Sequence, residues 1–218
     1  MYLPKLLEET DLSVLHALIR KHPFGTWVTL VDGELEANHV PFLLDAGRGE
    51  FGTLVAHVAK ANSVWKRFSA TVSSVVAFQG AETYITPSWY PSKHADGKAV
   101  PTWNYAVVHA HGIPRAIEDR DWLRAHVGQL TDFHEASQAL PWKVSDAPED
   151  YIERMLQGIV GIELPISHLV GKWKVSQNRP EPDKLGVVAG LLSRSDDSSR
   201  KMASLVNQHV SLTSGHHD

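Results

Sequence analysis

The first half of the chain alternates between hydrophobic and polar residues in a way that predicts β-strands. Apolar residues at helical spacing first predict a helix at 12–19. Period-two alternation and β-branched residues then predict strands at 26–31, 35–44, 51–58, 71–78, 83–86 and 102–117, the last of them interrupted at Gly112 and Pro114. The Asp32-Gly33 pair predicts a tight hairpin turn between the first two strands. Strands joined by such short connections favour an antiparallel barrel over a β/α sheet.

The second half of the chain changes to helical periodicity. Asp119 can cap an amphipathic helix, and a second helix is expected at 148–156. Two strands, at 159–164 and 170–175, and two helices, at 183–192 and 197–208, complete the pattern. We therefore expect an α+β fold, an antiparallel barrel with flanking helices and a helical C-terminal extension. It should form a single domain over residues 1–210, followed by a polar tail at 211–218 that is expected to be disordered.

Composition narrows the classes of protein that the chain can represent. It contains no Cys, which excludes a disulfide scaffold, a thiolate zinc finger, an iron–sulfur site and a Cys nucleophile. Lys and Arg number 21 against 25 Asp and Glu, and this net charge of −4 argues against a broad basic face for nucleic acid. The chain has no apolar run of about 18 residues and no apolar signal core. We therefore expect a cytoplasmic protein without a membrane span.

Two segments combine aromatic rings with hydrogen-bonding groups. In one, a strand runs into a turn, and its candidate residues are Tyr84, Ser88, Trp89 and Tyr90. In the other, Thr102 and Asn104 would share one face of a strand and Trp103 would lie on the opposite face. Flat rings suit a planar ligand, and an Asn amide can read the edge of a heterocycle. The alternative is structural: a loop folded onto the core, and a strand with its Trp inside and its Asn in solvent.

Two further segments could hold an anion. A strand end leads into a helix start, where free N–H groups suit a phosphate, and its candidates are His57, Val58, Lys60 and Asn62. The preceding strand adds Asn38 and His39. Another strand end places cations beside amides, which also suits a phosphate or carboxylate, and its candidates are Lys174, Gln177, Asn178 and Arg179. The alternatives are an ordinary Asn-capped helix entry and a solvated strand end.

The histidines and the catalytic motifs give weaker signals. His109 and His111 lie two apart on a strand and point the same way, as in half of a metal site. No spacing selects a third ligand among His39, His57, His94 and the carboxylates, so we expect no metal. The sequence has no nucleophilic triad order, Walker loop or dinucleotide fingerprint. It therefore singles out no catalytic residue.

Six motifs, in order along the chain, resemble the PaiB family. They are NHVPFLL (38–44), HVAKAN (57–62), YITPSWY (84–90), VPTWNY (100–105), HAHG (109–112) and KVSQNR (174–179). The resemblance runs from residue 1 to about residue 206. Asn38 stands where a small hydroxyl residue is common in the family, and Thr86 where Ser is common. Members are described as FMN-binding negative transcriptional regulators.

The resemblance implies a fold, a cofactor and an assembly. The fold would be the split β-barrel shared with pyridoxamine-phosphate oxidase and flavin reductases, in a homodimer with FMN at the subunit interface. The FMN phosphate would lie near 57–62, ring contacts would come from 84–90 and 102–104, partly from the partner subunit, and 174–179 would close the site. DNA would be a partner, although the net charge of −4 gives this no support. The alternatives are an FMN-dependent oxidoreductase, a haem-binding split barrel and a protein without a cofactor.

Overall fold

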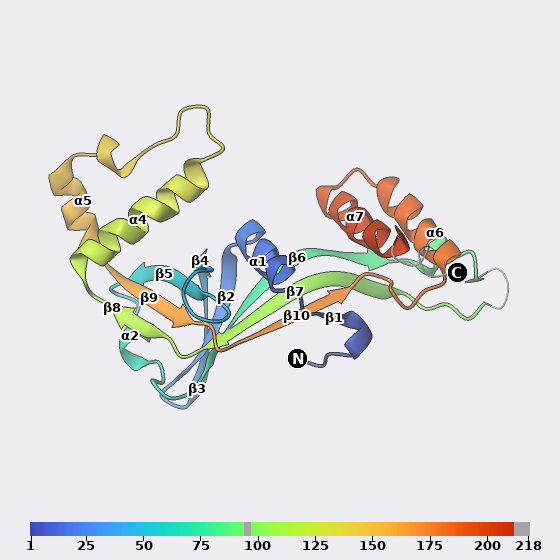
Figure 1. The fold of residues 1–218 in the computed structure, drawn as a ribbon, viewed down its shortest axis with the longest axis horizontal. Helices are drawn as coiled ribbons and strands as arrows, with labels where there is room; N and C mark the ends of the chain where they lie inside the picture. The colour runs from blue at the N-terminus through green and yellow to red at the C-terminus, as the bar shows by residue number, and fades with distance from the viewer. Residues whose placement is uncertain (94–96, 212–218) are drawn as a thin grey trace. The chain divides into compact units, whose positions relative to one another are not determined.

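The computed structural model describes residues 1–93 and 97–211 (Figure 1). His94 and the expected tail beyond residue 211 lie outside these residues. Within the span expected as one domain, the chain forms two compact units. Unit 1 comprises Met1–Leu18, Gln79–Val108 and the chain from Val170 onward, and unit 2 comprises Ile19–Phe78 and His109–Leu169. Helix α1 (Leu12–Lys21) continues along the chain from one unit into the other, as do three strands, β6 (Ser74–Ile85), β7 (Thr102–Gly112) and β10 (His168–Lys174).

Unit 1 is built on a sheet with two helices packed against each other. Its strand order is β1 (Glu8–Glu9), β10 (His168–Lys174), β7 (Thr102–Gly112) and β6 (Ser74–Ile85). Two 3-10 turns, η1 (Lys5–Leu7) and η2 (Pro87–Trp89), precede β1 and follow β6. Helices α6 (Glu181–Leu192) and α7 (Asp197–Ser211) follow β10 and lie side by side (Figure 1). Each helix has apolar side chains that are completely buried, namely Val187 and Leu191 in α6 and Met202 and Val206 in α7.

Unit 2 contains a hairpin and a separate four-stranded sheet. The hairpin joins β2 (Phe24–Val31) to β3 (Glu34–Pro41), and β2 also pairs with β6. The second sheet has the order β4 (Leu43–Asp45), β5 (Thr53–Ala59), β9 (Ile159–Pro165) and β8 (Arg115–Ile117), and all its pairs are antiparallel. The remaining elements are α2 (Val64–Arg67), α4 (Arg120–Glu135), η3 (Val144–Asp146) and α5 (Glu149–Leu156).

Most of the predicted elements are confirmed, and two strand boundaries are corrected. Asp32 and Gly33 both have positive φ, 51° and 92°, as the predicted hairpin turn requires. The strand predicted at 35–44 is divided into β3 and β4 at buried Phe42, because β3 pairs with β2 whereas β4 pairs with β5 in the other sheet. The strands predicted at 71–78 and 83–86 are one strand, β6. Gly80 does not break it; a Cβ there would lie 3.2 Å from the Ala106 carbonyl oxygen, so glycine permits close packing instead.

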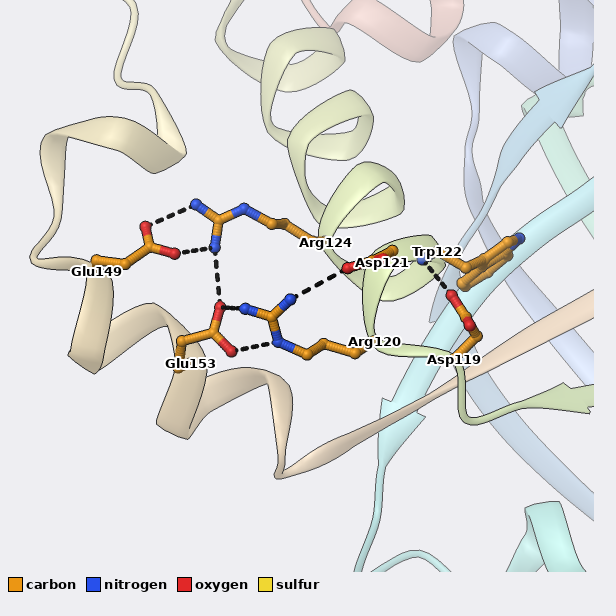
Figure 2. Close-up of polar contacts among 7 residues, drawn as sticks. All are labelled: Asp119, Arg120, Asp121, Trp122, Arg124, Glu149 and Glu153. Atoms are coloured by element: carbon orange, nitrogen blue, oxygen red, sulfur yellow. Dashed lines mark hydrogen bonds and ion pairs between the residues drawn. The ribbon is translucent and has the colours of Figure 1, made fainter.

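Helices α4 and α5 are joined by an apolar cluster and by ion pairs. Leu123 packs with Ile152 and Leu156 at the buried side of the two helices. On the exposed side, Arg120 and Arg124 reach Glu149 and Glu153 of α5 (Figure 2). Asp119 caps α4 as predicted, since its carboxylate accepts the Trp122 N–H at 2.7 Å. Across residues 1–93 and 97–211, no helix has the length and apolar character that a membrane span needs.

Candidate functional site

A pocket of about 120 Å³ lies within unit 1, where β7 and the end of β10 meet the chain after η2. Of the residues that the sequence proposed, it brings together Tyr90, Thr102, Asn104, Lys174, Asn178 and Arg179. It also includes three that the site prediction did not contain, Val100, Pro101 and Ser176. Among the described residues, two cations and several hydrogen-bonding groups line this pocket and no carboxylate does. Such a lining favours an anionic group.

The alternation of β7 decides which side chains reach the pocket. Asn104 is only 1% exposed, and its Nδ2 donates to the Ser176 hydroxyl at 2.9 Å. Thr102, on the same side, accepts a hydrogen bond from Lys174 Nζ. Trp103 points the other way and is 52% exposed. The structural alternative for this strand, with the Trp in the core and the Asn in solvent, is therefore reversed.

Tyr90 and Arg179 form the other wall of the pocket. Tyr90 is fully buried, and its hydroxyl has no hydrogen-bond partner among the described residues. The Arg179 guanidinium lies over the Tyr90 ring, 4.4 Å from its centroid. Burial raises the pKa of Tyr90 and the negative charge of nearby Asp183 adds to that rise, while the charge of Arg179 and its close approach to the phenol oppose it. The phenol therefore stays protonated at neutral pH and can donate to a bound acceptor.

Four other predicted residues of unit 1 lie outside the lining of this pocket, namely Tyr84, Ser88, Trp89 and Gln177. The Trp89 ring packs so closely on α6 that a Cβ at Gly190 would lie 2.3 Å from it, and Arg194 covers the ring at 4.6 Å. Gln177 accepts from the Val175 N–H and donates to the Trp173 carbonyl, which fixes the end of β10. Ser88 and Asn178 are exposed, and Tyr84 lies edge-on to Trp103 with ring centroids 6.2 Å apart.

The strand end at 57–62, in unit 2, has most of its polar groups already occupied. Asn62 donates to the Asn38 side chain at 2.8 Å and accepts the Val64 N–H at 3.0 Å. Lys60 pairs with the Glu118 carboxylate at 3.5 Å. This is the arrangement of an ordinary helix entry, and α2 beyond it has only four residues. The candidates that the sequence placed here therefore offer no unpaired cation to an anion.

The histidines of unit 2 and Val58 take other positions. Val58 is buried, and exposed His39 stacks on Phe24 with centroids 6.2 Å apart. His57 Nδ1 lies 3.1 Å from His126 Nε2, and burial lowers the pKa of both histidines, that of His126 to about 4. His109, His111 and His168 have neighbouring rings. Within residues 1–93 and 97–211, no group of three His, Cys, Asp or Glu is arranged to hold a metal ion.

The site prediction omitted Ser176 although the sequence carried a signal for it. Ser176 lies two residues after Lys174, so a continued strand would place both on one face. The strand ends first: β10 stops at Lys174, and Ser176 adopts a positive φ of 65°. Its hydroxyl reaches Asn104 because of this turn. Val100 and Pro101 have apolar side chains that did not suggest a binding role, and they line the pocket because they immediately precede Thr102 in the chain.

Comparison with known proteins identifies relatives along nearly the whole chain. A protein of Emericella nidulans, described as uncharacterised, is 33% identical over 95% of this chain and 97% of its own length. The Bacillus subtilis protein named "Protease synthase and sporulation protein PAI 2" is 30% identical over 96% of this chain and 98% of its own length. Residues 1–168 match the family described as "Putative FMN-binding domain".

Solved structures confirm the predicted split-barrel fold. The flavocytochrome Anf3 of Azotobacter vinelandii has a TM-score of 0.54 at 12% identity, covering 77% of this chain and 69% of that one. The FAD and heme binding protein of Mycobacterium smegmatis has a TM-score of 0.55 at 15% identity, with coverage of 77% and 73%. Together, the match to the domain family and the similarity to PAI 2 along the whole chain show that this chain belongs to the PaiB family of FMN-binding domains.

Proposed function

We propose that this protein binds FMN and that the unit 1 pocket holds its phosphate. The observation that carries the proposal is the pocket's donor set: Lys174 and Arg179 line the pocket, no carboxylate of the described chain lines it, and the buried Tyr90 hydroxyl accepts or donates no hydrogen bond within the described chain. A phosphate supplies acceptors for these donors. This placement differs from the one expected at 57–62, where the Lys60 ammonium and the Asn62 amide already have partners.

The size of the pocket limits what it can hold. Ligand sites for molecules of flavin size occupy about 300–1,000 Å³, and this pocket has about 120 Å³. It would therefore take the phosphate end, and the isoalloxazine ring would lie outside it. When bound, FMN would supply electron-transfer chemistry, and the protein would supply binding and orientation.

We also propose that the protein acts as a homodimer. Tyr84 and Trp103 form an aromatic pair on the sheet of unit 1 and are 40% and 52% exposed. Lys172 Nζ lies over the neighbouring Tyr105 ring, 5.4 Å from its centroid. Exposed aromatic groups of this kind are typical of interfaces. A second subunit covering them would provide flat rings beside the flavin, as the family resemblance implies.

Negative transcriptional regulation is the output that we propose for the FMN-bound dimer. Its support is the family membership, because the chain's charge of −4 limits DNA contact to a local basic patch. In an electrophoretic mobility-shift assay with DNA from the promoter of the protein's own gene, binding should weaken steeply as the salt concentration rises, since phosphate contacts release counterions. A flat response to salt would contradict DNA binding. Bleaching of bound FMN by NAD(P)H, with recovery in air, would instead favour an oxidoreductase.

The test of flavin binding is an absorbance titration of the purified protein with FMN and, separately, with riboflavin. FMN should give a saturable spectral change. Riboflavin should bind at least about tenfold more weakly, because it lacks the phosphate that the cations would hold. Sedimentation analysis of the same samples would report the dimer. Absence of a spectral change with FMN would refute flavin binding, and equal affinity for both flavins would refute the phosphate assignment.

A further inference from the structure

A second cavity, of about 490 Å³, lies wholly within unit 2 between helix α4 and strands β4 and β5. None of the candidate residues predicted from the sequence lines it. Its walls are mainly apolar, formed by Leu43, Leu44, Val55, Trp122 and Phe133. The volume and the apolar lining are those of a small-molecule site.

One wall of this cavity is a preformed aromatic surface. Gly161 of β9 lets the Trp122 ring lie against the strand, since a Cβ there would be 2.2 Å from the ring. Trp122 stacks on His126 with centroids 5.2 Å apart and planes 19° apart. Its indole N–H donates to Glu163 Oε1 at 3.1 Å. These contacts fix the ring, so a flat ligand would meet it without a rotamer change.

Arg48, the cation among the residues that line the cavity, is paired with carboxylates. Arg48 donates to both oxygens of Glu163, at 2.7 and 3.0 Å, and these bonds lower the pKa of Glu163. Asp45 lies 3.9 Å from the same guanidinium. His126 is neutral at pH 7, because burial lowers its pKa to about 4. The cavity therefore has no uncompensated cation to attract an anion such as a phosphate.

Two polar groups of α4 at the cavity lack partners. The side-chain amide of Gln129 lines the cavity from an exposed position of α4 and makes no hydrogen bond with the described part of the chain, so it is available to a ligand. His126 also lines it, and its Nδ1 is buried without a partner among the same residues. An amide offers both a donor and an acceptor, so it can engage a carbonyl or a ring nitrogen of an uncharged ligand.

We propose that this cavity binds an uncharged, fused-ring aromatic compound that lies against Trp122 and Phe133 and hydrogen-bonds to the Gln129 amide. The inference does not depend on flavin binding, because no residue of the cavity lines the unit 1 pocket. It assigns a second class of ligand to the protein, one that the cavity would recognise by its flat shape and by hydrogen bonds to uncharged groups. The first pocket instead offers positive charge.

The experiment titrates Nile red, an uncharged fused-ring dye, into the full-length protein and follows its fluorescence. Saturable enhancement is expected for the wild type. Ala125→Phe places a ring in the cavity from an exposed helical position and should weaken binding at least about tenfold. Gln129→Leu keeps the bulk of the side chain but removes the amide, so it should weaken binding several-fold.

The matched control is Ala61→Phe, the same substitution at an exposed position of unit 2 outside the cavity, which should leave the titration unchanged. Circular dichroism would show that each variant is folded. Absence of enhancement in the wild type, or equal affinity in the wild type and Ala125→Phe, would overturn the proposal. Displacement of the dye by FMN would also overturn it, because the cavity would then belong to the flavin. Retention of the dye in FMN-saturated protein would support a separate site.

Discussion

The two units differ in whether the cations that line their cavities are paired with carboxylates. In unit 1, Lys174 and Arg179 line a pocket in which the described chain places no carboxylate. In unit 2, Arg48 is matched by buried Glu163, and the His57–His126 pair is held neutral by burial. The difference teaches that the presence of cations in a cavity does not define its ligand. What matters is the charge left uncompensated after the protein's own pairs have formed.

The largest expected effect tests the charge of the unit 1 pocket. Replacing both cations, in the double variant Lys174→Met/Arg179→Met, should raise the FMN dissociation constant about 100-fold, because two charge-assisted hydrogen bonds to phosphate are lost. Riboflavin affinity should change little. Absorbance titration measures both constants.

Lys60→Met distinguishes the two phosphate placements. It removes a cation that already pairs with Glu118, so FMN affinity should stay at the wild-type value. If Lys60→Met weakened FMN binding as much as the double variant, the phosphate would lie at the strand end 57–62, and the comparison between the units would have to be redrawn.

A pair of glycine substitutions compares helix packing in the two units. Gly190→Ala in α6 would bring a Cβ to 2.3 Å from the Trp89 ring, and overpacking of this kind costs about 1–3 kcal/mol of unfolding free energy. Gly128→Ala in α4 meets no atom within 4 Å and should stabilise by about 0.5–1 kcal/mol, since Ala favours the helix. Urea unfolding measures both. A neutral Gly190→Ala would contradict the close packing of Trp89.

The neutral histidine of unit 2 predicts a pH dependence of stability. The pKa of His126 is about 4 in the folded protein against 6.5 as its ordinary value. Between these pH values His126 is protonated in the unfolded chain and neutral in the folded chain. The contribution of neutral His126 to the free energy of unfolding is therefore fully present above pH 6.5 and decreases as the pH drops toward 4. The loss should reach about 2 kcal/mol at pH 5.

His126→Gln should flatten this dependence, measured as urea unfolding at pH 7 and pH 5. The flattening should be partial, because burial also lowers the pKa of His57. An unchanged pH profile in the variant would show that His126 is not the group responsible.

The smallest expected effect concerns the exposed ion pairs between α4 and α5. Arg120→Ala removes contacts to Glu153 and Asp121 that lie at the surface (Figure 2). It should lower the melting temperature slightly at low salt and not measurably at high salt, because exposed pairs are screened. A loss that persists at high salt would indicate that Leu123 packing depends on Arg120.

Local signals in the sequence predicted most elements of the fold. Asp32-Gly33 formed the expected turn and Asp119 the expected helix cap, because both depend on neighbouring residues only. The break predicted between residues 78 and 83 was wrong, since Gly80 in that segment allows a close approach to Ala106, a residue distant in the chain. The six motifs indicated the family from short stretches of sequence alone, and the family match and the relatives confirmed it.

The sequence by itself therefore determined the order of the elements, the family and the set of residues from which a binding site could be drawn. It determined that Thr102 and Asn104 share a face of β7, because strand alternation is a local property. Only the tertiary structure decided that this face is buried against Ser176 and that Arg179 covers Tyr90. It also decided that the Asn62 side-chain amide donates its hydrogen bond to Asn38. Burial and pairing depend on residues far apart in the chain, and no local pattern specifies them.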